Sequence, residues 1–157
     1  PLTSESPNTT GAESLEFLIS TIPGKPPKAL AQIASGGELS RISLAIAVVT
    51  AQTSNIPTVV FDEVDVGIGG GVAEVVGNLL RELGQRGQVF CVTHLAQVAA
   101  KGNSHLLAQK SVSKSGATTS ITELNTEKRT AELARMMGGL DVTQSSIAHA
   151  AEMLESA

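Results

Sequence analysis

Two short apolar runs, separated by a helical pattern, constrain the fold of this chain more than any other feature of its sequence. Residues 58–61 and 89–92 consist almost entirely of β-branched, aromatic and other apolar residues, which is typical of parallel strands covered on both faces. Between them, after a glycine-rich turn over 67–71, apolar residues recur at helical spacing until Gly84. This order favours a right-handed parallel crossover. We therefore expect an α/β fold in which helices flank a largely parallel sheet.

The segments before this unit carry weaker patterns. Apolar residues at helical spacing predict a largely buried helix over 37–53, and alternating apolar and polar residues predict a strand near 14–20. Three prolines make residues 23–28 a rigid connector. The polar residues 1–13 are interpreted as a linker or a boundary, so that 14–157 would form one folded part.

The segments after this unit predict a hairpin and two helices. Residues 104–110 and 118–124 are expected to pair across a polar turn, near the C-terminal end of the chain. Helices are expected over 127–137 and 143–155.

The composition limits what the chain can bind and where it acts. Its 15 acidic and 11 basic side chains give a net charge of −4, and only 2% of its residues are aromatic. Phosphate neutralisation and base stacking are both disfavoured, so this chain alone should bind DNA weakly or not at all. The single cysteine, Cys91, excludes an internal disulfide, and no run of about 20 apolar residues is present. We expect a cytoplasmic protein with no membrane partner.

Adjacent carboxylates follow the first apolar run, where Asp62 and Glu63 come directly after Phe61. Open α/β sheets bind ligands at the carboxyl ends of their strands. Two strand-ending turn formers would give the same pattern, but side-by-side like charges favour a cation or a proton-transfer role. In nucleotide hydrolases such a pair divides the work: Asp62 would help to hold Mg²⁺, and Glu63 would orient or deprotonate the attacking water.

A histidine follows the second apolar run, where His94 comes after Thr93. An isolated histidine at a strand end is more often a turn or surface residue. If the two strands are neighbours, however, His94 lies at the same sheet edge as Glu63, where it can polarise a γ-phosphate. Cys91 lies three positions before His94, which places the two side chains on opposite faces and disfavours a Cys/His nucleophile.

The segment Ser35-Gly36-Gly37-Glu38 precedes the first long helix and has two readings. It fits a capping box in which Ser35 and Glu38 satisfy the free amides of the helix start. It also fits a phosphate site, in which two glycines let the backbone approach a polyphosphate. That site needs open space over Gly36 and Gly37, and an aspartate at position 37 should then cost the fold little.

Two familiar nucleotide motifs are missing. The glycines at 67–71 do not fit the dinucleotide fingerprint, because Val72 or Glu74 occupies its last position. Gly24-Lys25 lacks the earlier glycine of a P-loop and precedes a proline. The sequence therefore contains no P-loop.

The motifs occur in an order that resembles a known family. A helix starting at SGGE, a strand ending in DE, then D-V-G, and a strand ending in TH, without a P-loop, is similar to the C-terminal half of an ABC-type ATPase head. The segments ASGGELSRISLAI, FDEVDVGIGG, CVTHLAQVAA and ELARMMGG closely resemble the RecN family of bacterial DNA repair proteins, which are SMC-like. The resemblance covers roughly residues 11–155.

The resemblance implies a role for each motif. Ser35, Gly36, Gly37 and Glu38 would form the signature motif, which contacts ATP held by an opposing head. Asp62 would be the Walker B carboxylate that binds Mg²⁺, and Glu63 the catalytic base. Asp65 would lie in the D-loop that crosses the head interface, and His94 would be the switch histidine.

The resemblance also implies the setting in which the chain acts. The whole protein would hydrolyse ATP between two paired heads during recombinational repair of DNA double-strand breaks in the bacterial cytoplasm, at the nucleoid. Its partners would be the Walker A lobe across a coiled coil, a second head, and DNA. The chain alone is expected to be inactive. Two alternatives stay open: a head segment of another SMC-like or ABC ATPase, and an interaction module that has lost catalysis.

Overall fold

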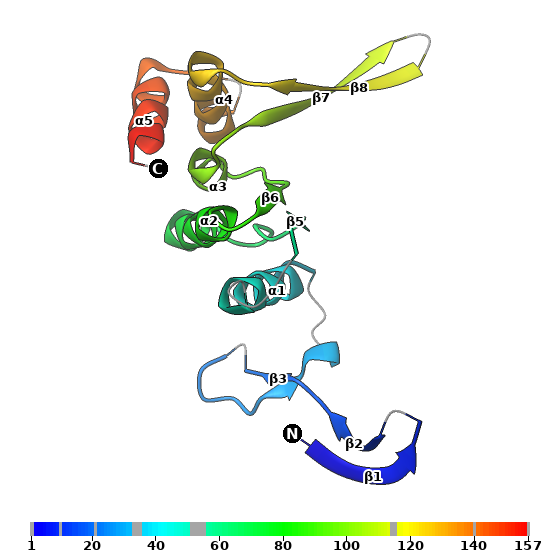
Figure 1. Ribbon diagram of the computed structural model, residues 1–157. Coiled ribbons are helices and arrows are strands. Elements are labelled where there is room, and N and C mark those ends of the chain that lie inside the picture. The colour runs from blue at the N-terminus through cyan, green and yellow to red at the C-terminus, as the bar shows by residue number, and fades with distance from the viewer. Residues whose placement is uncertain are drawn as a thin grey trace.

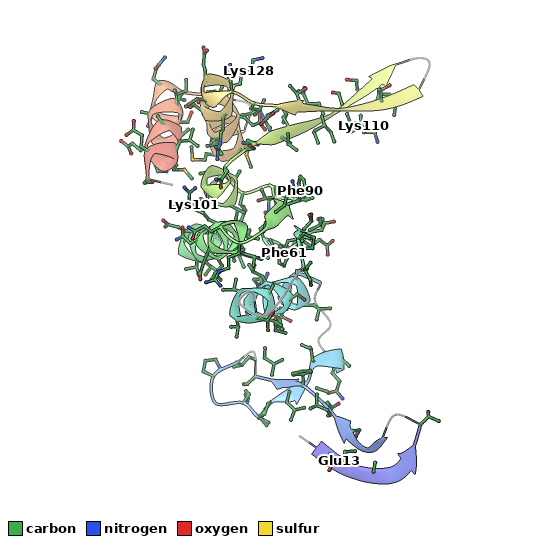
Figure 2. The ribbon with its side chains drawn as sticks, in the orientation of Figure 1. Glu13, Phe61, Phe90, Lys101, Lys110 and Lys128 are labelled. Carbon is green, nitrogen blue, oxygen red and sulfur yellow. The ribbon has the colours of Figure 1, made fainter. Side chains whose placement is uncertain are left out.

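The fold is taken from a computed structural model, which describes residues 2–9, 11–20, 22–32, 36–50, 56–113, 116–139 and 141–156. Figure 1 shows small antiparallel strand pairs at the N-terminal end, a central layer of helices and two strands, and then two helices with a projecting hairpin. The catalytic residues expected from the sequence lie in the central layer. Ser35 lies outside the described residues.

The central layer is a strand–helix–strand unit. Strand β5 (Thr58–Phe61) pairs in parallel with β6 (Gln88–Cys91), in a register that places Phe61 opposite Cys91. Helix α2 (Gly70–Gly84) connects them and packs its buried positions Val76 and Leu80 against the sheet. The expected α/β fold with a parallel crossover is therefore confirmed.

Only one face of this two-stranded sheet is covered. Val59 and Val89 pack against the core, whereas Val60 and Phe90 on the other face are 65% and 42% exposed. Successive strand residues point to opposite faces, so every second residue of each strand lies on the open side. The expectation of strands covered on both faces is therefore wrong for the chain as described.

Helix α1 (Gly36–Thr50) lies beside α2 and contributes Leu44 to the central core. Ala47 and Val48 pack against the same core, but Leu39, Ile46 and Val49 are exposed. The helix was expected to be largely buried, and this expectation is wrong, since only Gly37 and Leu44 of its residues are buried. The predicted last turn, 51–53, lies outside the described residues.

A second core joins three helices and follows the central layer. Helices α3 (Ala96–Lys101), α4 (Thr126–Gly138) and α5 (Gln144–Glu155) meet through one leucine and several alanines, whose small side chains allow close packing; these are Ala96, Ala100, Leu133, Ala134 and Ala150. Both C-terminal helices were predicted from the sequence, and both begin with a side-chain cap. Helix α3 was not predicted.

An arginine of α4 holds the end of α3. The guanidinium of Arg129 donates to the carbonyl oxygens of Ala99 and Ala100 at 3.0 and 2.8 Å, and also to that of Gly102. These carbonyls lie at the C-terminal end of the helix, where a positive charge interacts favourably with the helix dipole. Burial and the nearby charge of Arg81 lower the pKa of Arg129 from its ordinary value.

The hairpin extends away from the helices. Strands β7 (Leu106–Ser113) and β8 (Gly116–Glu123) pair antiparallel along their whole length, and Figure 1 shows them projecting to one side of α4. The predicted hairpin is confirmed, with longer strands than expected. Residues 114–115 lie outside the described residues.

The N-terminal part differs most from expectation. Strands β1 (Leu2–Asn8) and β2 (Gly11–Leu15) form an antiparallel pair where a linker was expected, since backbone pairing needs no apolar side chains. The single strand expected near 14–20 is interrupted at 16–17. Its second part, β3 (Leu18–Ile19), pairs instead with β4 (Lys28–Ala29), which a 3₁₀ turn, η1 (Leu30–Gln32), follows.

The connector between β3 and β4 agrees with the sequence except at Lys28, which begins β4. Residues 22–27 form no strand or helix, as the prolines predict. Across the parts of the chain that the structure describes, no helix is long and apolar enough to cross a membrane.

Candidate functional site

The turn after β5 presents the paired carboxylates. Asp62 and Glu63 are exposed, and the Oδ1 atom of Asp62 accepts a hydrogen bond from the backbone N–H of Glu63 at 2.9 Å. Glu63 has a φ of 58°, a left-handed conformation that is uncommon for residues other than glycine. The next residue, Val64, is fully buried in the central core. This anchor holds the turn in place, and strained backbone of this kind clusters at functional sites.

The turn after β6 carries His94, as expected from the sequence. The side chain of His94 is 67% exposed, and its Nδ1 atom lies 3.3 Å from the Oδ2 atom of Asp65. The backbone N–H of His94 donates to the same oxygen at 3.0 Å, and the hydroxyl of Thr93 donates to it at 2.5 Å. One carboxylate oxygen therefore joins the ends of the two parallel strands.

Asp65 is the most deeply buried charged residue of the described chain, at 2% exposure. A buried carboxylate is tolerated only where donors replace its lost water, and Thr93 and His94 supply them. Asp65 was expected at a head interface, on the basis of resemblance alone. That place stays a prediction. Within this chain the carboxylate connects the turn that holds Glu63 to the turn that holds His94.

Cys91, the last residue of β6, is half-buried and packs against the central core. Burial, together with the negative charges of Asp65 and Asp62, raises the pKa of its thiol from 9.0 to about 12. A thiol with so high a pKa stays protonated at neutral pH and is a poor nucleophile. This environment agrees with the argument from the sequence against a Cys/His nucleophile.

The start of α1 faces the turn after β5. A Cβ atom placed on Gly36 would lie 2.7 Å from the Oε2 atom of Glu63. The missing side chain thus lets the Glu63 carboxylate approach the first turn of the helix, where the helix dipole favours negative charge. The structure brings Gly36 and Glu63 together within one chain, although the sequence patterns placed them on separate elements.

Gly37 is buried against the same turn. A Cβ atom at this position would lie 2.9 Å from the carbonyl oxygen of Val66 and 3.2 Å from that of Glu63. The open space expected over Gly36 and Gly37 is therefore absent in this arrangement. An aspartate at position 37 would clash with backbone atoms, so the expectation that it costs the fold little is wrong. Glu38 is half-buried in the first turn of α1.

Sequence reasoning missed two residues of this site. Arg41 lies one helical turn after Gly37, and its Nη1 atom donates to the carbonyl oxygen of Val66 at 2.8 Å. Thr93 was noted only as a neighbour of His94. The spacing of Gly37 and Arg41, four residues apart on a predicted helix, was the one available signal, because such residues lie on the same helix face.

The site has carboxylate oxygens that could coordinate a cation, but these do not enclose a complete metal site. Within the described ranges, no group of three or more histidine, cysteine or acidic side chains gathers as a metal site would. Asp62 and Glu63 carry carboxylate oxygens, which are the kind of ligand that Mg²⁺ prefers, and Mg²⁺ is commonly held by one or two carboxylates together with substrate phosphates.

Comparison with curated proteins finds relatives that match nearly the whole chain. The chain is 51% identical over 147 residues to the DNA repair protein RecN of Vibrio cholerae, 50% identical over 149 residues to that of Xylella fastidiosa, and 40% identical over 147 residues to that of Bacillus subtilis. These matches cover 94–95% of this chain and 26–27% of the relatives. The chain thus spans about a quarter of the length of the curated relatives it matches. No family model matches it.

Comparison with solved structures finds a similar fold. A structure from work on the ATP-driven dimerization and DNA stimulated activation of SMC ATPases aligns with a TM-score of 0.53 and 20% sequence identity. The alignment covers 75% of this chain and 70% of that one. At this identity the match shows a shared fold and nothing more.

Proposed function

This chain is a RecN-type sequence, and from that premise we propose that it forms part of the ATPase head of an SMC-like DNA repair protein. The observation that carries the proposal is the arrangement of Glu63, Asp65 and His94. These residues lie at the carboxyl ends of two adjacent parallel strands, which is where open α/β sheets bind ligands. Exposed acid–base groups held there by a buried carboxylate suit a site for phosphate chemistry.

The paired carboxylates would have different roles at this edge of the sheet. Asp62 would supply an oxygen ligand to Mg²⁺, and its charge matches a divalent cation. When bound, the ion neutralises charge on the phosphate oxygens of ATP. Glu63 would orient the attacking water and accept its proton, because its exposed carboxylate lies beside Asp62 at the end of β5.

His94 would report on the nucleotide through its neighbours. Its exposed ring can donate to a γ-phosphate oxygen, while Asp65 holds its backbone and faces its Nδ1 atom. Loss of the γ-phosphate would then release His94, and its contacts with Asp65 would pass the movement to the turn after β5. Such coupling between a phosphate and a loop is the usual switch in nucleotide hydrolases.

The segment Ser35–Glu38 would complete a second site, on the nucleotide of an opposing head. Helix starts bind phosphates through free backbone amides and the helix dipole. In this chain the Glu63 carboxylate lies against Gly36, so it must turn away before a phosphate can approach. ATP-dependent pairing of two heads would therefore involve a rearrangement of Glu63 in each.

The whole protein would carry the remaining parts. The proposed partners are the lobe that bears the Walker A lysine, a second copy of the head, and DNA, which this acidic chain would bind weakly or not at all. Its work would be recombinational repair of DNA double-strand breaks at the bacterial nucleoid, in the cytoplasm. The relatives' shared description as DNA repair proteins supports this setting.

A glutamate substitution tests the catalytic proposal. In the full-length protein, Glu63→Gln should leave ATP binding and head pairing intact but slow turnover by on the order of 10² to 10⁴, as for loss of a general base. Glu127→Gln, at an exposed position in the first turn of α4, is the matched control and should turn over normally. Normal turnover by Glu63→Gln would exclude it as the base, and would favour an interaction module or a different head chemistry.

A neighbouring substitution separates the metal ligand from the base. Asp62→Asn should weaken ATP binding that depends on Mg²⁺, because a neutral amide is a poor ligand for a divalent ion. Titration of nucleotide binding with and without Mg²⁺ measures the difference. Equal metal dependence in Asp62→Asn and the parent protein would remove Asp62 from the metal site.

A further inference from the structure

Arg41 joins the first helix to the turn that carries the paired carboxylates. Its Nη1 atom donates to the carbonyl oxygen of Val66 at 2.8 Å and lies 3.5 Å from the carbonyl oxygen of Val64. The side chain comes from the second turn of α1 and is half-buried. A guanidinium suits this task because its planar group of donors can serve two carbonyls at once.

The path to those carbonyls is open because position 37 has no side chain. A Cβ atom on Gly37 would lie 3.1 Å from the Nη1 atom of Arg41 and 2.9 Å from the Val66 oxygen. Gly37 and Arg41 are four residues apart and share a helix face. The glycine and the arginine therefore act together: Gly37 lets the helix backbone approach the turn after β5, and the guanidinium of Arg41 binds that turn.

The turn held by Arg41 is the one that carries Asp65. Val64 and Val66 flank this buried aspartate, and the N–H of Val66 closes the turn on the carbonyl oxygen of Glu63 at 3.2 Å. Asp65 in turn accepts from Thr93 and from the backbone of His94. A continuous series of contacts thus runs from the start of α1 to His94.

We propose that Arg41 is a positioning residue, which couples the helix that begins at Gly36 to the Glu63 turn and to His94. This inference rests on the proposed function for its kinetic consequences, but its structural part does not. When a phosphate approaches the start of α1, the movement would reach Glu63 and His94 through the Arg41 contact. Arg41 touches none of the reacting groups and acts only through the turn.

Hydrogen exchange tests the coupling without any need for turnover. In the full-length protein, Arg41→Met keeps the aliphatic stem but removes the donors. The amides of Val66 and His94 should then exchange faster, by on the order of tenfold, while those of the second core stay unchanged. The control is Arg86→Met, since Arg86 lies exposed in the turn after α2. Unchanged exchange of both amides in Arg41→Met would overturn the proposal.

Kinetics then distinguish positioning from general support of the fold. Arg41→Met should lower the kcat for ATP by about 10- to 100-fold, the scale of a small misplacement, with little change in KM. Arg41→Lys, which keeps one charged donor, should recover part of the loss. Because Arg41 acts through Asp65, adding Asp65→Asn should slow the enzyme no further than the slower single variant. Strictly additive losses would overturn the proposal.

The two proposals fail in different ways. If Glu63→Gln keeps normal turnover, the proposed chemistry fails, while the exchange measurement still decides the role of Arg41. If Glu63→Gln is slow but Arg41→Met turns over like the parent, only the coupling fails. If Arg41→Met does not fold, Arg41→Lys takes its place in both measurements, and parent-like exchange and kcat in that variant would count against the coupling.

Discussion

The carboxylate of Asp65 accepts a hydrogen bond from the backbone N–H of His94 at 3.0 Å and lies 3.3 Å from the Nδ1 atom of the same residue. These contacts tie the turn after β5 to the turn after β6. Because the carboxylate is almost fully buried, its bonds face little competition from water. The geometry of Glu63 and His94 thus depends on a residue that lies between them and beneath the surface.

Replacing this carboxylate should cost stability. Asp65→Asn keeps the shape but removes the charge, so the bonds from Thr93 and His94 weaken. We expect the free energy of unfolding to fall by about 1.5–3 kcal/mol, the range for hydrogen bonds to a charged group. Denaturant unfolding of the purified chain measures this. Asp141→Asn, at an exposed position before α5, should change stability by less than about 0.5 kcal/mol, and equal effects of the two substitutions would contradict the role of Asp65.

The parts of the fold that the sequence predicted are those with strong local patterns. The unit β5–α2–β6 follows from two apolar runs and a helical spacing, and the positions of Asp62, Glu63 and His94 follow from the strand ends. Parallel pairing then brings these residues to one edge without further information. Both helices after the hairpin were predicted because they too have a strong local pattern, with apolar residues at helical spacing.

The parts that were missed depend on contacts from distant segments. Helix α3 is only six residues long, and Arg129 of α4 holds its end. The β1–β2 pair forms from a polar stretch that carries no apolar alternation. The surroundings of Gly37 come from backbone atoms of Glu63 and Val66, which no pattern within the helix could indicate.

The stability contribution of Cys91 should depend on pH. Burial chiefly, and then the charges of Asp65 and Asp62, raise the pKa of its thiol from 9.0 to about 12. The folded state therefore binds this proton more tightly than the unfolded state does. Its contribution is fully present below about pH 9 and is lost as the pH rises toward about 12.

A cysteine variant isolates this effect from the other titrating groups. The difference in unfolding free energy between the parent and Cys91→Ala should shrink between about pH 8 and about pH 10.5. Urea unfolding at both pH values measures it. A difference that stays constant across this range would show that the thiol has an ordinary pKa in the folded chain.

The chain by itself should bind ATP weakly. Its sequence contains no P-loop, and so it lacks the amide cradle and the lysine that hold the β- and γ-phosphates. We expect calorimetry of the purified chain to detect no micromolar affinity, and we expect negligible hydrolysis. Adding the lobe that carries the Walker A motif should restore binding. Tight binding by the chain alone would mean that the phosphates are held by residues other than those proposed.

Two glycine-to-alanine substitutions should act with opposite sign. At Gly37 a Cβ atom would lie 2.9 Å from the Val66 oxygen and 3.2 Å from the Glu63 oxygen, which are backbone atoms that cannot swing aside. Gly37→Ala should therefore destabilise the chain by about 1–3 kcal/mol, as overpacking does. Gly71, in the first turn of α2, has nothing within 4 Å of the same atom, so Gly71→Ala should stabilise by about 0.5–1 kcal/mol through helix propensity. Thermal unfolding of both variants measures the contrast. If Gly37→Ala proved as stable as Gly71→Ala, then α1 would not lie close against the Glu63 turn, and the contact from Arg41 to Val66 would lose its basis.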